Sequence, residues 1–150
     1  MDIGVFLAHT VKIELDTEEA YLQLIELMTE RGNHDVAEFF REMAGFSHLH
    51  RNLAMSRAGF DDSTDIHGII DSWSGSNTVE TPFLNDFQRA LDLDGAMSLA
   101  LAAEKRAAVF YAEVAQSTTD SQIRQLAEEF AEEERGHVLA LERFFGREPY

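Results

Sequence analysis

The stretch LAEEFAEEERGHVLAL, residues 126–141, places two ionisable side chains on the apolar face of a predicted helix. Glu134 and His137 are three residues apart, so an α-helix turns them to the same side. That side also carries apolar residues at helical spacing, namely Ile123, Ala127, Phe130 and Leu141. An unpaired charge among apolar side chains is costly. The stretch therefore predicts a helix that buries Glu134 and His137 together, in a site where both find a partner.

Outside this stretch, helical periodicity predicts an all-α chain with four long helices. They span about residues 2–31, 35–57, 92–116 and 120–145. Between the second and third helices, residues 61–81 are rich in Ser, Gly, Asp, Asn and Thr and show no sustained period. Pro82 then opens a short helical piece that runs to about residue 90. Short turns within each pair of helices and one long connection between the pairs predict a single domain, residues 1–150, folded as a ferritin-like four-helix bundle with a crossover.

The other three long helices also turn an ionisable side chain toward their apolar faces. Glu14 falls near the centre of the first apolar stripe, Glu104 repeats this on the third helix, and His50 lies inside the stripe of the second. A tyrosine follows each glutamate by seven residues, Tyr21 after Glu14 and Tyr111 after Glu104. The two halves of the chain therefore look like a degenerate repeat of about ninety residues.

Three inward carboxylates and two inward histidines would strongly destabilise one small bundle if they stayed unpaired. A bound cation removes this conflict. Oxygen and imidazole ligands suit iron or manganese, and inward glutamates with Glu-x-x-His motifs form the di-iron carboxylate arrangement. For Glu14 and Glu104, the alternative to metal binding is a hydrogen bond to a tyrosine across the bundle. Tyr21 and Tyr111 are expected to orient a ligand, or else only to fill the core. The predicted metal ligands are Glu14, His50, Glu104, Glu134 and His137.

Composition excludes several other classes of protein. The chain has no cysteine, which excludes disulfides, zinc knuckles, iron–sulfur clusters and thiol catalysis. Its formal net charge of −16 repels phosphate groups, so we expect neither nucleic acid nor an anionic membrane surface as a partner. The N-terminal residues show neither a basic leader nor an unbroken apolar run. These features predict a soluble, cytoplasmic protein.

Three phrases resemble the rubrerythrin branch of the ferritin-like di-iron superfamily: KIELDTEEAYLQL, AAEKRAAVFYAEVA and LAEEFAEEERGHVLAL. The resemblance covers all four long helices. It implies terminal carboxylates at Glu14 and Glu104, a bridging carboxylate at Glu134, and imidazole ligands at His50 and His137. It also implies a di-iron site, with manganese or zinc as alternatives. The expected function is an oxidoreductase that reduces peroxide or dioxygen or oxidises ferrous iron, with electrons from an external donor. The alternatives are a non-catalytic metal-binding protein and a purely structural bundle.

The sequence departs from the family's pattern at two ligand positions. Ser47 stands where the family has a bridging glutamate, three residues before the histidine of the second helix. Ala107 stands where rubrerythrins proper carry a second glutamate on the third helix, and the cysteine-containing rubredoxin domain is absent. Glu18, one turn after Glu14, is either a substitute ligand or an acid at the edge of the stripe that reaches to water.

The remaining polar and apolar positions have simpler interpretations. We expect four histidines to be solvated, His9, His34, His48 and His67, and four acids to face outward, Glu128, Glu129, Glu132 and Glu133. The predicted inner stripe of the second helix contains Val36, Phe39, Phe40, Met43, Phe46 and Leu53. Apolar residues on the long connection need a surface to cover, so they predict a homodimer or larger assembly unless they pack on their own bundle. These residues are Ile66, Ile69, Ile70 and Trp73.

Overall fold

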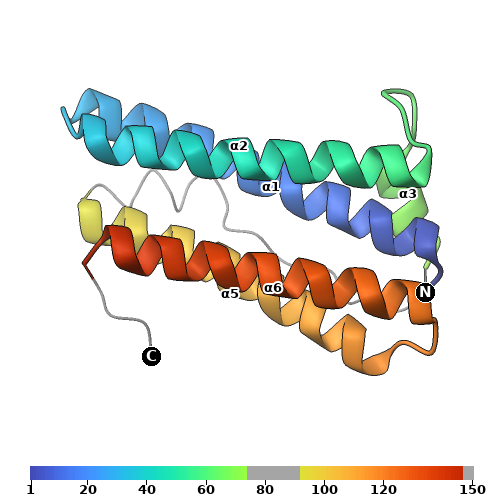
Figure 1. Ribbon diagram of the computed structural model, residues 1–150. Helices are drawn as coiled ribbons and strands as arrows, with labels where there is room; N and C mark the ends of the chain where they lie inside the picture. The colour runs from blue at the N-terminus through green and yellow to red at the C-terminus, as the bar shows by residue number, and fades with distance from the viewer. Residues whose placement is uncertain (74–91, 147–150) are drawn as a thin grey trace.

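The computed structural model describes residues 1–73 and 92–146, and α-helix is the regular secondary structure of this part of the chain. Two antiparallel hairpins lie one above the other (Figure 1). The first consists of α1 (Ile3–Glu30) and α2 (His34–Ala58), and the second of α5 (Leu93–Ser117) and α6 (Ser121–Phe144). A short helix, α3 (Ile66–Asp71), follows the first hairpin. The predicted all-α, ferritin-like bundle is therefore confirmed.

Aspartates cap the starts of three of the long helices, and a glycine ends α2. The side chain of Asp2 accepts a hydrogen bond from the Val5 amide at 2.9 Å, and Asp92 accepts one from Gly95 at 2.7 Å. Asp120 caps α6 in the same way. Each bond satisfies an amide that has no partner inside its helix. At the end of α2, Gly59 adopts a left-handed φ of 71°, a conformation that costs glycine little.

The core consists of two apolar layers with a polar layer between them. One layer is formed by the end of α1 and the starts of α2 and α5, and it includes Leu24, Phe40 and Met97. The other is formed at the opposite end of the bundle, and it includes Phe6 and Phe130. Each long helix contributes to both layers. The middle of each helix therefore lies between two apolar regions, where water has little access.

The long connection differs from the prediction, because residues 66–71 form α3. Asp65 caps this helix by accepting a hydrogen bond from Gly68 at 3.0 Å. The helix packs on α1, with Ile70 buried and Ile66 against the second apolar layer. Six residues are too few to display a helical period, so periodicity did not reveal α3. The predicted short helix at 82–90 lies outside the described residues.

The expectation that His9 is solvated was wrong. Its side chain is 2 % exposed, and its ring lies 5.6 Å from the rings of both Trp73 and Phe110. α3 brings Trp73 onto His9, which the sequence did not predict. Burial, and secondarily the charge of Lys12, lowers the pKa of His9. The other three histidines predicted to be solvated are exposed, namely His34, His48 and His67.

The buried His9 should make stability depend on pH in a defined range. Its pKa in the folded protein lies below the ordinary value of 6.5, so the unfolded chain binds the proton more readily. We expect the free energy of unfolding to fall as the pH drops below about 6.5 toward the folded pKa. His9→Gln should flatten this part of the pH dependence, measured by urea unfolding. The exposed control His34→Gln should leave it unchanged, and equal slopes in all three proteins would contradict the assignment.

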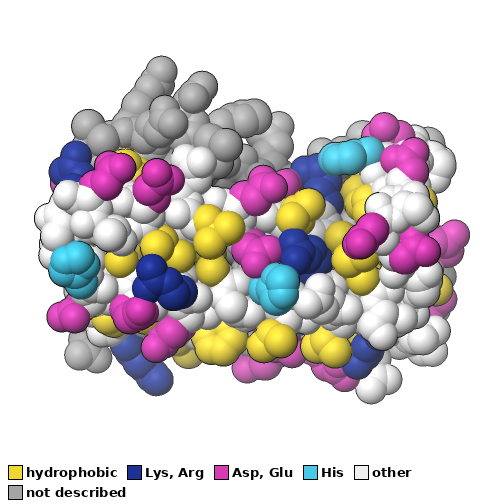
Figure 2. All heavy atoms as spheres, turned by 90° about the horizontal axis from the view of Figure 1, so that it is seen from above, with side chains coloured by type: hydrophobic (Ala, Val, Ile, Leu, Met, Phe, Trp, Pro, Cys, Tyr) yellow, Lys and Arg dark blue, Asp and Glu magenta, His cyan; other side chains and the backbone are white. Residues whose placement is uncertain are grey.

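Two predicted core residues of α2 are on the surface: Phe46 is 49 % exposed and Leu53 is 56 % exposed. The buried face of α2 instead follows Val36, Phe40, Met43, Ser47, His50 and Ala54. At 100° per residue, Phe46 and Leu53 lie roughly 80–100° from the centre of that face. Together with Leu49, which is 62 % exposed, they form a separate apolar flank. Figure 2 looks down on the α1–α2 hairpin and shows hydrophobic side chains interspersed with charged ones on this face.

Candidate metal centre

The polar layer brings together the five side chains predicted as metal ligands. Glu14 comes from α1, His50 from α2, Glu104 from α5, and Glu134 and His137 from α6. The three glutamates are each 2 % exposed and His50 is 6 % exposed. The side chain of His137 is 17 % exposed. So many ionisable groups in one buried layer require neutralising partners.

These side chains form two groups that share one residue. Glu14, His50 and Glu134 make the first group, and Glu104, Glu134 and His137 make the second. Within each group, one potential ligand atom per residue lies within 4.8 Å of the others. Glu134 belongs to both groups. The resemblance predicts a bridging carboxylate at this residue, and that role stays a prediction.

The distances between ligand atoms fit a metal ion. His50 Nδ1 lies 3.1 Å from Glu14 Oε1. His137 Nδ1 lies 3.3 Å from Glu104 Oε2 and 3.3 Å from Glu134 Oε2. Adjacent ligands of an octahedral ion with bonds of about 2.1 Å are separated by about 3.0 Å. The ring nitrogens therefore lie about as far from the carboxylates as neighbouring ligands of one cation do.

Burial and the neighbouring charges of the site shift the pKa values of four of these groups. Burial raises the pKa of Glu134 well above its usual value, and the charge of Glu104 adds to this. Burial also opposes ionisation of Glu104, but hydrogen bonding with Glu134 and His137 lowers its pKa overall. The pKa values of His50 and His137 are raised despite burial, because Glu14 and Glu104 respectively hydrogen-bond to them. The carboxylates are thus stabilised by protons, which a bound cation would replace.

The two tyrosines predicted to orient ligands differ in their contacts. The hydroxyl of Tyr21 donates a hydrogen bond to Glu104 Oε1 at 2.8 Å. Burial, together with the charge of Glu104, raises the pKa of Tyr21 well above its usual value, so this hydroxyl keeps its proton. The hydroxyl of Tyr111 is buried without a hydrogen-bond partner among the described residues, and its ring packs edge-on against Phe130. Of the two tyrosines, only Tyr21 therefore hydrogen-bonds to a predicted ligand.

Neither Ser47 nor Glu18 adds a carboxylate to these groups. Ser47 is 1 % exposed and lies on the buried face of α2, where its hydroxyl carries no charge. Glu18 accepts a hydrogen bond from Arg51 at 2.8 Å, and its other oxygen lies 2.9 Å from His48 Nδ1. These contacts direct Glu18 away from the buried groups. The arrangement matches the interpretation of Glu18 as an acid at the edge of the helix face.

Sequence reasoning missed Glu133, which was expected only to face outward. Its side chain is 54 % exposed, yet its Oε2 lies 2.6 Å from Nε2 of the buried His50. Glu133 therefore connects α6 to α2 at the edge of the site. The available signal was its spacing, since Glu133 lies four residues before His137 and so on the same flank of α6.

A surface depression of about 310 Å³ lies over the two histidines. It is lined by Phe46, Leu49, His50, Leu53, Glu133 and His137. The ring of Phe46 stacks on that of His137, with the ring centres 5.4 Å apart. The exposed apolar flank of α2 thus forms one wall of an opening that leads from the surface to both predicted imidazole ligands.

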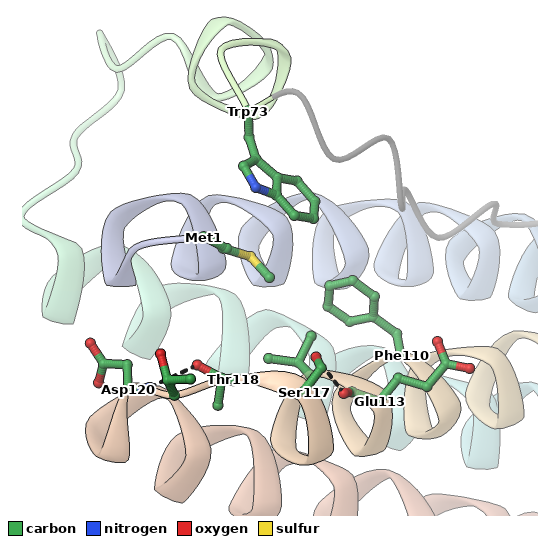
Figure 3. A pocket seen from close by; sticks show the side chains of 9 residues that line it. Met1, Trp73, Phe110, Glu113, Ser117, Thr118 and Asp120 are labelled. Carbon is green, nitrogen blue, oxygen red and sulfur yellow. Dashed lines mark hydrogen bonds between the residues drawn. The ribbon is translucent and has the colours of Figure 1, made fainter.

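A second hollow, of about 270 Å³, lies at one end of the bundle. Figure 3 shows Trp73 and Phe110 pointing toward it from opposite sides, with Ser117, Thr118 and Asp120 along its floor. None of the five predicted ligands lines it. Of the two hollows, only the one over His50 and His137 adjoins the candidate metal centre.

Comparisons with known proteins agree with this geometry. The family model for rubrerythrin matches residues 6–145. Among solved structures, the chain is similar to an uncharacterized conserved protein from Magnetospirillum magnetotacticum MS-1, with 28 % identity and a TM-score of 0.79. That match covers 100 % of this chain and 97 % of the other. No curated protein matches significantly. Among the described helices, none has the length and apolar character needed to cross a membrane. The buried glutamate and histidine groups fit a di-iron carboxylate protein, and the chain belongs to the rubrerythrin family.

Proposed function

We propose that this protein is a di-iron oxidoreductase that reduces peroxide or dioxygen with electrons from an external donor. The observation that carries the proposal is the position of Glu134 in both groups of potential ligands. A carboxylate shared in this way suits two neighbouring cations better than one. Iron, with manganese or zinc as alternatives, suits the oxygen and imidazole ligands that the chain offers.

Different residues of the chain would bind the two ions of this centre. Glu14 and His50 would hold one ion, Glu104 and His137 the other, and Glu134 both. When bound, a pair of iron ions supplies the electron transfer to peroxide or dioxygen. The hydrogen bond from Tyr21 fixes the orientation of Glu104. The two apolar layers limit the access of water to this region.

A second candidate function is non-catalytic metal binding. It is favoured by Ser47, because a buried serine contributes no negative charge where the family has a bridging glutamate. Steady-state consumption of hydrogen peroxide, with a chemical reductant, separates the two functions. We expect consumption that requires iron and disappears in Glu134→Ala. A protein that binds iron but consumes no peroxide would be assigned the second function.

Anomalous diffraction tests the metal centre itself. Crystals of iron-loaded protein, measured on both sides of the iron absorption edge, should show anomalous density between His50 and His137. Two peaks beside Glu134 are expected. The absence of any peak in loaded crystals would overturn the proposal, whatever activity the solution shows.

The loss of a carboxylate at Ser47 should make the two metal positions unequal. Two divalent ions carry four positive charges, and Glu14, Glu104 and Glu134 supply three negative ones. We expect Ser47→Glu to raise the affinity of the weaker position about tenfold or more and to bring the stoichiometry toward two. Ser47→Gln, similar in size but uncharged, is the matched control. Equal, tight binding of two ions by the wild type, measured by titration calorimetry and unchanged in Ser47→Glu, would contradict this prediction.

A homodimer or larger assembly remains a proposal, but Ile66, Ile70 and Trp73 of the long connection no longer support it. Ile66 and Ile70 lie against their own bundle, and Trp73 packs on His9. The exposed side chains of Phe46, Leu49 and Leu53 on α2 support an assembly instead. Light scattering should give a mass above the 16.9 kDa of one chain, and that monomer mass across a wide concentration range would reject it.

A further inference from the structure

The ring of His50 lies between two carboxylates from different helices. Its Nδ1 lies 3.1 Å from Glu14 Oε1, on the side of the buried groups. Its Nε2 lies 2.6 Å from Glu133 Oε2, on the side of the surface depression. The side chain of His50 is 7 % exposed, whereas that of Glu133 is 54 % exposed. Glu133 therefore reaches a buried ring from the solvent side.

The chemistry of a histidine ligand indicates which ring nitrogen would bind the metal and which would donate a hydrogen bond. A neutral imidazole has one nitrogen with a proton and one with a lone pair. The nitrogen that binds a metal uses its lone pair, and the other N–H commonly donates to a carboxylate that fixes the ring and its tautomer. In His50, Nδ1 is the nitrogen beside Glu14, so Nε2 is the nitrogen left to donate.

Nε2 has no other acceptor within the described part of the chain. The atom is buried and makes no well-aligned hydrogen bond, because the Glu133 oxygen lies beside it rather than in line with its N–H. The Glu133 side chain is exposed enough to turn into line. Such a turn would satisfy a buried N–H that is otherwise left without an acceptor.

The charge balance of the metal centre also supports a role for Glu133. The three buried carboxylates leave one positive charge uncompensated when two divalent ions are bound. Glu133 is the acid that contacts the ring of His50 from outside, and it would bring the sum to zero. Among the described residues, His137 contacts carboxylates only through Nδ1, to Glu104 and Glu134. Any effect of Glu133 should therefore concern the position next to His50.

We propose that Glu133 is a positioning residue of the metal centre. It accepts a hydrogen bond from His50 Nε2–H, leaves the lone pair of Nδ1 for the metal ion, and supplies from the surface the negative charge that Ser47 lacks. This inference rests on the proposed metal centre and deepens it. It assigns the two ions different environments, with the one next to His50 dependent on a side chain outside the buried layer.

Zinc titration of the full chain tests the proposal without relying on activity. We expect Glu133→Ala to weaken one of the two zinc sites roughly 10- to 100-fold, as measured by competition with a chelator. Glu133→Gln keeps an acceptor oxygen but removes the charge, so its loss should be smaller. Glu132→Ala is the matched control, since Glu132 is an exposed neighbour that pairs with Arg135 instead. It should retain wild-type affinity.

Nitrogen-15 NMR of the histidine rings in the zinc-loaded protein provides a readout that a general structural effect would not change. The wild type should show His50 bound through Nδ1 with a proton on Nε2, and Glu133→Ala should lose this slowly exchanging proton. Equal zinc affinities in wild type and Glu133→Ala would overturn the inference, as would an equal loss in Glu132→Ala or a His50 bound through Nε2. If the wild type binds no zinc and no iron, the proposed metal centre itself fails.

Discussion

Removing the metal from the iron-loaded protein should lower its melting temperature by roughly 8–16 °C. Ligand present at about 1,000 times its dissociation constant stabilises a folded protein by about 4 kcal/mol. For a chain of this length, each kcal/mol changes the melting temperature by about 2–4 °C. The physical reason is that bound cations would neutralise Glu14, Glu104 and Glu134, each of which is 2 % exposed. Differential scanning calorimetry of loaded and chelator-treated samples at pH 7 gives the measurement.

A control separates this effect from weak binding of cations to the acidic surface. Magnesium at the same concentration should change the melting temperature little, because it prefers oxygen ligands and retains its water molecules. If the metal-free and iron-loaded proteins melt at the same temperature, the buried carboxylates do not bind iron, and the proposed function loses its basis.

Glu134→Gln should have opposite effects on the two forms of the protein. In the metal-free form it should raise the melting temperature, because burial raises the pKa of Glu134 and a neutral amide avoids the cost of ionising it. In the presence of iron it should abolish tight binding of both ions, because Glu134 belongs to both groups. We expect the stoichiometry to fall from two ions to none under conditions that saturate the wild type.

The matched control is Glu128→Gln, which changes the same charge at an exposed position of the same helix. It should leave both the metal stoichiometry and the melting temperature unchanged. Elemental analysis and calorimetry on the same samples give the two readouts. A Glu134→Gln protein that still binds two ions tightly would show that Glu134 does not bridge them.

Local patterns were sufficient for the fold and for the five inward-facing ionisable groups. Helix starts could be predicted because Asp2, Asp92 and Asp120 cap their own helices, and such bonds reach only two or three residues along the chain. Glu14 and Glu104 could be found because helical periodicity alone places them on an apolar face. A buried charge on such a face signals a site without any knowledge of its neighbours.

Helical periodicity could not predict the contacts between helices. Periodicity gives the angle of a side chain about its own helix axis, but it does not show which helix lies opposite. For this reason Tyr21 and Tyr111 were treated alike, although only Tyr21 meets a carboxylate. Phe46 was placed in the core because its apolar flank lies next to the buried face of α2. Whether such a flank is covered depends on the separation of the hairpins.

The sequence by itself determined the four long helices and the inward positions of Glu14, His50, Glu104, Glu134 and His137, because each follows from interactions within a few residues of one helix. The tertiary structure alone decided that Glu134 lies in both groups, that α3 buries His9 under Trp73, and that Glu133 reaches His50. These features depend on distances between segments far apart in the chain. A long, half-exposed side chain such as Glu133 contacts a buried ring only when another helix brings that ring within its reach.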